Sequence, residues 1–204
     1  IVKAVTSRNE PISSVVPQGI TGAWNAPELY EYDETKARGF LGVRSPASRT
    51  EDTSSIVTVR LLASQHGAHK ILAEQIKAAL KKTLGFNVMI DYVSPSELEF
   101  KTFEHKHDIF IGILAPEYPS AFAVLESFMS RAAKNPVAMR SKEFDQILTQ
   151  AFAADGVEEQ GEFLRIAQRV LLKDVVALVP LYQSHTMTFL SPAVKRFDLT
   201  PLRH

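Results

Sequence analysis

The sequence predicts an α/β fold with a largely parallel sheet flanked by helices, because strand-like and helix-like segments alternate through its middle. Three apolar runs are typical of strands, at residues 55–63, 86–93 and 108–114. Two helical segments, at 67–84 and about 95–105, separate them. A β-α-β-α-β series normally gives adjacent parallel strands joined by right-handed crossovers. We therefore expect one sheet that contains all three strands side by side.

The first strand and the first helix have the strongest patterns. Residues 55–63 (SIVTVRLLA) are apolar and rich in β-branched side chains, which favour a strand. Residues 67–84 carry apolar side chains at spacings of three and four, with lysines largely on the opposite face. The apolar set is Ile71, Leu72, Ile76, Ala79 and Leu80, and the lysines are Lys77, Lys81 and Lys82. Gly85 predicts the end of this helix.

The third strand leads into a restricted loop that holds one carboxylate. After 108–114 (DIFIGIL) comes Pro116-Glu117-Tyr118-Pro119, where two prolines end any ladder and restrict the backbone around Glu117. Ligands of open α/β sheets bind outside the carboxyl ends of the strands. The other two carboxyl ends are Ser64–Gly67 and Ser94–Pro95, where Ser94 opens the second helix.

The regions before and after the sheet differ in character. Residues 7–54 are rich in Pro, Gly, Ser and Thr, with one helical segment at about 33–41 that Asp33 can cap. Two amphipathic helices follow the sheet, on either side of a turn at 153–158. Their apolar positions are Phe144, Ile147, Leu148, Ala151 and Phe152, then Phe163, Ile166, Ala167, Val170 and Leu171. Residues 175–190 predict a further strand, with Pro180 at an edge or a bend.

Composition limits the classes of function. The 204 residues include 23 basic and 23 acidic side chains, so we expect no nucleic-acid partner. No apolar run approaches the ~20 residues that cross a bilayer, and the first ten residues lack the layout of a signal peptide. We therefore expect a soluble segment, with any export signal outside it. The absence of cysteine excludes disulfides, thiolate catalysis and cysteine-based zinc sites.

The sequence contains no catalytic motif. G-x-S-x-G, the P-loop, G-x-G-x-x-G and H-E-x-x-H are all absent, so we expect neither an enzyme nor a cofactor. Two histidine pairs, His66/His69 and His105/His107, have spacings at which imidazoles can share a metal. Because no tight His/Asp/Glu cluster accompanies them, we favour surface or capping histidines and expect no metal site.

Five segments, in this order along the chain, carry a resemblance to a known family. They are VPQGITG (16–22), YDETKARGFL (32–41), AEQIKAALKKTLGFNVMI (73–90), DIFIGILAPEYPSAF (108–122) and VPLYQSHTMTFLSPAVKRFDLTP (179–201). They resemble motifs in the carboxyl-terminal lobe of the peptide/nickel-type (family 5) solute-binding proteins of bacterial ABC importers. The resemblance covers nearly the whole chain and implies a lobe like those of type II periplasmic binding proteins.

The resemblance also implies a domain organisation. Residues 1–204 would form a single carboxyl-terminal lobe: a crossover and connecting region (1–54), the α/β lobe (55–190) and a return segment (191–204). The amino-terminal lobe is absent, and both chain ends should emerge on the side that faces it. Such receptors are exported to the periplasm, close on a ligand by hinge motion and deliver it to a membrane ABC permease. The signal peptide would lie outside this segment.

Alignment with the family signature places Glu117 where the family has the aspartate that pairs with a peptide's α-ammonium. Three departures surround this position. Leu114 replaces the usual tryptophan, Pro116 replaces a small residue, and Ser120-Ala121 replace Asp-Pro. These changes favour a differently shaped pocket or a divergent member. The alternative, that Glu117 is a solvated loop residue, stays open.

Further candidate ligand contacts come from the strand ends and from one aromatic loop residue. They are Tyr118, Ser64, Gln65, His66, Ser94 and Trp24. The start of the first helix can offer N–H groups to a carboxylate, or it is a simple helix entry. Trp24 can stack on a ligand, or it belongs to the core or to an interlobe contact, as we expect for Phe122, Phe128 and Tyr182.

The function implied is capture of peptides, or a related small solute, between two lobes for import. A lobe on its own should bind feebly or not at all, because half a cleft holds only part of the contacts. The alternative is the ligand-sensing module of a transcription regulator, since some regulators carry a similar solute-binding module.

Overall fold

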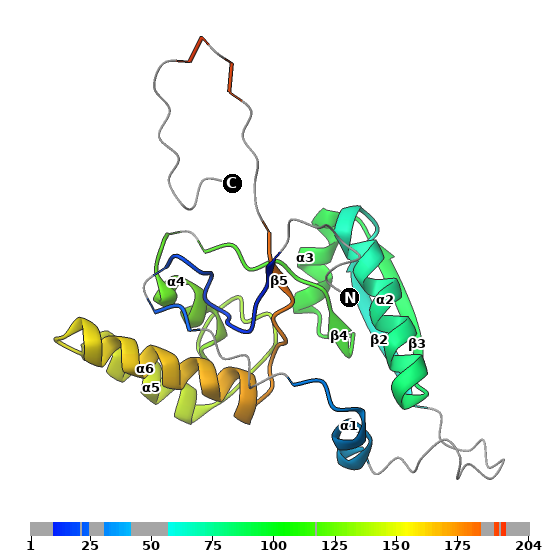
Figure 1. The fold of residues 1–204 in the computed structure, drawn as a ribbon, viewed down its shortest axis with the longest axis horizontal. Helices are drawn as coiled ribbons and strands as arrows, with labels where there is room; N and C mark the ends of the chain where they lie inside the picture. Colours follow the sequence, from blue (N-terminus) through cyan, green and yellow to red (C-terminus); the bar gives the residue numbers. More distant parts are fainter. Residues whose placement is uncertain are drawn as a thin grey trace. The chain divides into compact units, whose positions relative to one another are not determined.

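The computed structural model describes residues 10–20, 22–24, 31–41, 57–116, 118–184, 190–191 and 193–194. The chain forms two compact units (Figure 1). The first, here called the sheet unit, is built mainly from Tyr30–Ile113. The second, here called the helical unit, is built mainly from Thr6–Leu29 and Leu114–His204. The predicted lobe boundaries stay a prediction, and the prediction for the two chain ends lies outside the described residues.

The sheet unit contains the predicted parallel sheet. Its strands are β2 (Thr58–Ser64), β3 (Asn87–Val93) and β4 (Ile109–Phe110), in the order β3-β2-β4. Both pairings are parallel, and the β2–β3 register runs from Thr58↔Asn87 to Ser64↔Val93. The prediction of three adjacent parallel strands in one sheet is therefore confirmed, although β4 is much shorter than expected.

Strand β4 is short because little of the 108–114 segment reaches β2. Asp108 and Ile111 still donate backbone hydrogen bonds to β2, at 3.0 Å each, but only two residues form the ladder. Beyond Gly112 the chain leaves the sheet, and Ile113 is 78% exposed. The apolar sequence of this segment therefore overstated the length of the strand.

Helix α2 (Gly67–Leu84) has the predicted bounds and packs on β2 and β3 (Figure 1). Gly85 ends it in the left-handed conformation, with φ 72°, as glycine allows. Its buried stripe consists of His69, Leu72 and Ala73 rather than the full predicted apolar face. Ile71 is exposed, because its position is rotated by about 100° from Leu72 around the helix.

Helix α3 (Pro95–Phe103) begins with a capping box at Ser94. The Ser94 hydroxyl accepts a hydrogen bond from the Glu97 N–H (3.3 Å), and Glu97 Oε2 accepts one from the Ser94 N–H (3.0 Å). Both bonds satisfy backbone donors that a helix start leaves free. Helix α1 (Glu34–Phe40) also starts as predicted, because Asp33 accepts a hydrogen bond from the Lys36 N–H at 2.9 Å.

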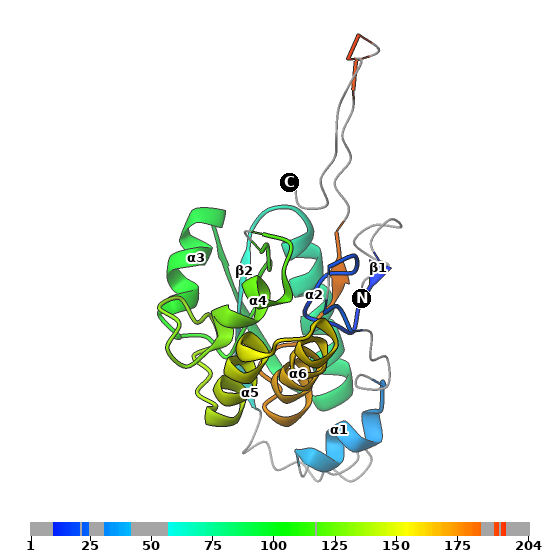
Figure 2. The ribbon, with the colours of Figure 1, turned by 90° about the vertical axis from the view of Figure 1, so that its left-hand side faces the viewer.

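The helical unit is built on the predicted amphipathic pair. Helices α5 (Lys142–Ala153) and α6 (Val157–Arg169) lie side by side in Figures 1 and 2, and α6 continues into a π-turn, η5 (Val170–Asp174). The core contributed by these three elements is Phe144, Leu148, Ala151, Leu164, Ala167, Val170, Leu171 and Leu172. Phe152, at 79% exposure, and Ile166 do not join it. Helix α4 (Ala121–Leu125) and η4 (Glu126–Phe128) bury Phe128.

The strand predicted at 175–190 is wrong for most of the residues that the structure describes. Only β5 (Tyr182–Gln183) is extended in a ladder, antiparallel to β1 (Glu10–Pro11). The preceding helix runs to Asp174, and Val176 has a φ of 53°, which no regular strand contains. Residues 185–189 lie outside the described part of the chain. Among the described residues, no helix is both long and apolar enough to span a bilayer.

The capping box predicts a measurable contribution of Ser94 to stability. Ser94→Ala removes the capping hydroxyl and should lower the free energy of unfolding by about 1 kcal/mol. Ser130→Ala, at an exposed position of the helical unit, is the control and should change it by less than about 0.5 kcal/mol. Urea denaturation of both variants measures this. Equal effects of the two substitutions would contradict the capping role.

Burial of His69 predicts a pH-dependent stability. Burial lowers the pKa of His69 from its ordinary value of 6.5, so the unfolded chain binds this proton more readily than the folded chain. The free energy of unfolding should therefore fall as the pH drops below 6.5 through the folded-state pKa. His69→Gln should reduce this fall in urea denaturation between about pH 7.5 and pH 5.

The exposed His66 offers a matched control, because His66→Gln makes the same substitution three residues earlier in the sequence. Part of the pH dependence should persist in His69→Gln. The reason is that burial, together with neighbouring His105, also lowers the pKa of His107. A pH dependence that is the same in His69→Gln and in the unmodified chain would contradict the assignment.

Candidate functional site

The carboxyl ends of β2 and β3 bring four of the predicted ligand residues together in the sheet unit. Ser64 is paired with Val93 in the parallel register, and the Gln65 N–H donates to the Val93 carbonyl oxygen at 2.9 Å. Ser64, Gln65 and His66 therefore lie at the same sheet edge as Ser94. This is the edge at which the sequence predicted ligand contacts.

The segment between β2 and α2 exposes polar groups at this edge. Ser64 is buried, and its hydroxyl accepts a hydrogen bond from the His66 N–H at 3.3 Å. Gln65 and His66 are exposed, with Gln65 Nε2 and His66 Nε2 3.3 Å apart. His66 occupies the N-cap position of α2, but its side chain makes no capping hydrogen bond. The edge can therefore offer a ligand both side-chain donors and the amide groups of a helix start.

The Ser94 hydroxyl caps helix α3, which is a structural task. It lies 2.7 Å from Glu97 Oε2, in addition to capping α3. The same bonds to Ser94 lower the pKa of Glu97 and keep its carboxylate ionised. The ligand-binding role of Ser94 stays a prediction, and the structure gives its side chain a local task at the same time.

The structure buries His69, for which the sequence predicts a surface or capping position. It is 8% exposed, and its Nδ1 has no hydrogen-bond partner among the described residues. Its spacing of three from Leu72 within the buried stripe was the available signal. In the other pair, His107 makes an edge-to-face contact with Phe110, at 5.3 Å between ring centres. The described residues contain no group of three or more His, Cys, Asp or Glu arranged for a metal.

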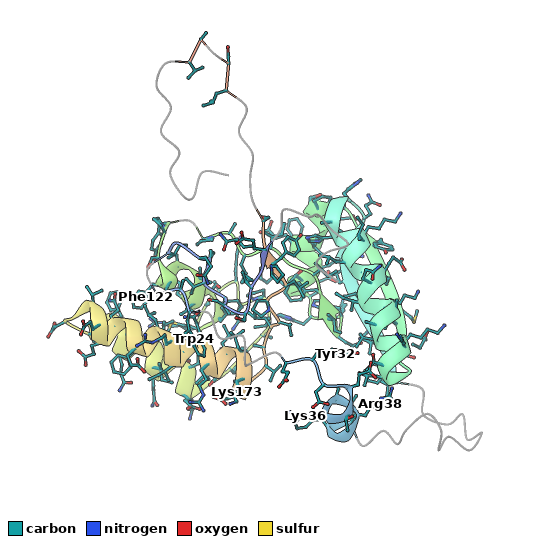
Figure 3. All side chains as sticks on the ribbon, viewed as in Figure 1. Trp24, Tyr32, Lys36, Arg38, Phe122 and Lys173 are labelled. Atoms are coloured by element: carbon teal, nitrogen blue, oxygen red, sulfur yellow. The ribbon has the colours of Figure 1, made fainter. Side chains whose placement is uncertain are left out.

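The helical unit contains the remaining candidates, Trp24, Glu117 and Tyr118. Glu117 lies outside the described residues, so its role stays a prediction. Tyr118 is partly exposed, and its hydroxyl donates to Glu126 Oε1 at 3.3 Å. Trp24 is half-buried, and Figure 3 labels it together with Phe122 of α4.

The turn that contains Gly22 and the start of α4 approach each other closely in the helical unit. Gly22 lies so near the start of α4 that a Cβ atom there would be 2.9 Å from the Cβ of Ala121. Ala121 follows Tyr118 by three residues. Two segments that are almost a hundred residues apart in sequence therefore meet, and each carries a predicted ligand contact.

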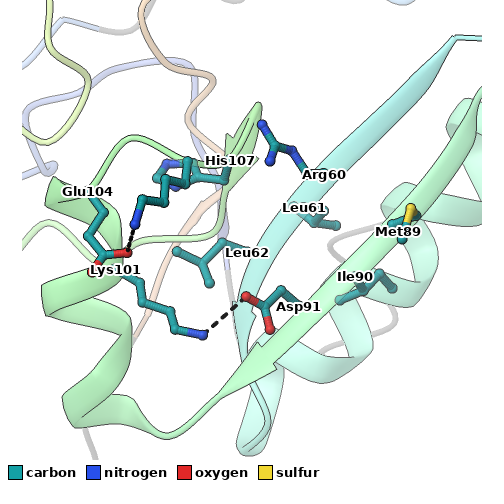
Figure 4. A pocket seen from close by; sticks show the side chains of 10 residues that line it. Arg60, Leu61, Leu62, Met89, Ile90, Asp91, Lys101, Glu104 and His107 are labelled. Carbon is teal, nitrogen blue, oxygen red and sulfur yellow. Dashed lines mark hydrogen bonds and ion pairs between the residues drawn. The ribbon is translucent and has the colours of Figure 1, made fainter.

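A pocket of about 470 Å³ opens beside α3 on one face of the sheet (Figure 4). Its lining is formed by Arg60, Leu61, Leu62, Met89, Ile90, Asp91, Lys101, Glu104, Lys106 and His107. The charges pair with one another, since Lys101 contacts Asp91 (3.2 Å) and Lys106 contacts Glu104 (3.4 Å). None of the predicted ligand residues lines this pocket. We therefore place the candidate site at the strand ends.

Comparison with known proteins identifies peptide-binding receptors as relatives. No family model matches the chain. It is 25% identical over 194 residues to the dipeptide-binding protein DppE of Bacillus subtilis (strain 168), covering 89% of this chain and 34% of that protein. The Escherichia coli murein tripeptide binding protein MppA matches with a TM-score of 0.75 and 17% identity, over 86% of this chain and 34% of MppA.

Two further solved structures have the same fold. The substrate-binding domain of an oligopeptide ABC transporter from Bacillus anthracis str. Ames matches with a TM-score of 0.69 and 25% identity, over 87% of this chain and 35% of that chain. Haemophilus influenzae OppA in complex with the peptide RPPGFSPFR matches with a TM-score of 0.71 and 16% identity, over 86% and 35% of the two chains.

The chain spans about a third of the length of these relatives. The shared architecture confirms the predicted fold class, an α/β fold like that of type II periplasmic binding proteins, with a parallel sheet flanked by helices. The family resemblance seen in the sequence is confirmed as well: this chain is related to the peptide/nickel-type (family 5) solute-binding proteins.

Proposed function

We propose that this chain is one lobe of the substrate-binding component of an ABC importer, and that its ligand is a peptide. The observation that carries the proposal is the polar edge of the sheet. Ser64, Gln65 and His66 lie beside Ser94 at the carboxyl ends of parallel strands, where α/β proteins bind ligands. The fold that positions them is shared with OppA bound to a nine-residue peptide.

The names of the relatives support the ligand class and leave the peptide length open. They describe receptors for dipeptides, for a murein tripeptide and for oligopeptides. For this chain we therefore propose peptides as a class. The function is binding rather than catalysis, and the protein would work outside the cytoplasmic membrane. None of the relatives described above supports a regulator's sensing module, so that alternative is not carried further.

Glu117 is proposed to bind the α-ammonium of the peptide. It is the only acidic residue between Asp108 and Glu126. An ammonium that leaves water needs a charged partner, because burying an unpaired charge costs several kcal/mol. The strand-end donors of the sheet unit are suited to the opposite charge, the carboxylate or the backbone carbonyl groups of the peptide.

We further propose that the lobe needs a partner lobe. Small ligands are held in clefts that remove most of their surface from water, and the described pocket of Figure 4 does not include the candidate residues. A second lobe would supply the other wall, close on the peptide by hinge motion and present it to the permease.

Replacing the Glu117 carboxylate tests the proposed function. In the two-lobed receptor, Glu117→Gln should weaken binding of a free-amine tripeptide by about 1.5–3 kcal/mol, the usual contribution of a hydrogen bond to a charged group. An N-acetylated tripeptide lacks the ammonium and should bind poorly to both forms. Isothermal titration calorimetry measures all four affinities.

Glu158→Gln, at an exposed position in the first turn of α6, is the matched control and should leave the affinity unchanged. Unchanged affinity in Glu117→Gln would show that Glu117 is a solvated loop residue that does not bind the peptide. The 204-residue chain alone should bind the peptide too weakly for calorimetry, and tight binding by it would contradict the two-lobe mechanism.

A further inference from the structure

A buried polar cluster in the helical unit holds the turn that carries Trp24. Ser14 and Gln168 are both 0% exposed, and the Ser14 hydroxyl lies 2.9 Å from Gln168 Oε1. Gln168 Nε2 donates to the carbonyl oxygens of Gly22 (3.0 Å) and Leu164 (3.2 Å). The Trp24 N–H donates in turn to the Ser14 hydroxyl at 3.4 Å. The turn is thus bound directly to α6 at Gly22, and Trp24 is linked to Gln168 only through the Ser14 hydroxyl.

Gln168 is an unusual choice for its position. Its neighbours on the buried face of α6 and η5 are Leu164, Ala167 and Leu171, so an apolar side chain of similar size could fill the same space. A buried amide is costly unless its donors and acceptor are all bonded. A fully bonded one fixes a single arrangement of the groups around it. Leucine or methionine would fill the space but could not bond to the Gly22 carbonyl oxygen. The specific contribution of Gln168 is therefore to fix the position of the Gly22–Trp24 turn.

Packing fixes the same turn from its other side. Gly22 has a φ of 92°, and a Cβ atom on it would lie 2.9 Å from the Cβ of Ala121 and 3.1 Å from Cδ1 of Leu164. The absence of a side chain at Gly22 lets the backbone lie directly against the start of α4. The turn that carries Trp24 is consequently held against the start of α4.

We infer that Gln168 is a positioning residue, which acts through Ser14 and the Gly22 carbonyl to hold Trp24 as an aromatic wall for a bound peptide. The inference rests on the proposed function. Trp24 is not fully buried, and a flat aromatic side chain fixed in advance binds with a smaller ordering cost. Neither Ser14 nor Gln168 needs to touch the peptide.

Trp24 is the only tryptophan of the chain, so its fluorescence reports on this turn without a label. In the 204-residue chain without peptide, Gln168→Met should increase the quenching of Trp24 emission by acrylamide, because the Gly22 carbonyl oxygen loses its bond to α6 and Ser14 loses its contact with Gln168. Gln160→Met is the matched control: this glutamine is on the same helix and donates to the Ala151 carbonyl oxygen, away from the turn. Circular dichroism verifies that each variant is folded.

Peptide affinity in the two-lobed receptor gives the second measurement. Gln168→Met should weaken binding about tenfold, because part of the binding free energy must then be spent on ordering the released turn and the Trp24 side chain. In a Trp24→Ala background the same substitution should have almost no further effect, because the wall that it positions is gone. Should Gln168→Met fail to fold, Ser14→Ala replaces it in both experiments, since this change removes the acceptor of the Trp24 N–H and leaves α6 intact.

The outcomes separate the inference from the function on which it rests. Unchanged Trp24 quenching, or the same loss of affinity with and without Trp24, would overturn the positioning role of Gln168 in a receptor that still binds peptides. Absence of peptide binding by the unmodified receptor would overturn the proposed function, and the role of Trp24 as a ligand wall with it.

Discussion

Strand β2 is paired on both of its edges, and the arrangement of the sheet unit depends on this constraint. It lies parallel to β3 along its whole length and parallel to β4 at Leu61 and Leu62, both of which are buried. Parallel neighbours require crossover connections, so α2 and α3 must pack on the sheet. All carboxyl ends then face the same edge. The juxtaposition of Ser64 with the residues that follow β3 is a consequence of that topology.

The sequence was sufficient where the pattern depends on local contacts. Helix α2 was predicted at both ends, because its apolar periodicity and Gly85 are properties of the helix itself. The strand at 108–114 pairs as predicted but is shorter, and the strand at 175–190 is mostly wrong, because an apolar run does not reveal how far a partner strand extends. Ile113 points to solvent, and the valines before Pro180 follow a helix that runs to Asp174. Strand length is decided by tertiary pairing.

The candidate site was predictable to a similar degree. Topology placed Ser64, Gln65 and His66 at the expected edge, but it could not show that the Ser94 hydroxyl already binds Glu97. Gln168 gave no signal, since an isolated glutamine in a helix is usually a surface residue. Its partners Ser14 and Gly22 are 154 and 146 residues away along the chain. Only the folded structure could show that these residues form one buried cluster beside Trp24.

Hydrogen exchange of the two-lobed receptor, followed by mass spectrometry with and without a saturating free-amine peptide, tests most directly whether the strand ends bind the ligand. The account predicts that the peptide slows exchange in segments 64–67 and 93–97, while the outer turns of α5 and α6 exchange as before. Saturation of the receptor with peptide and no protection in either of these two segments would contradict it.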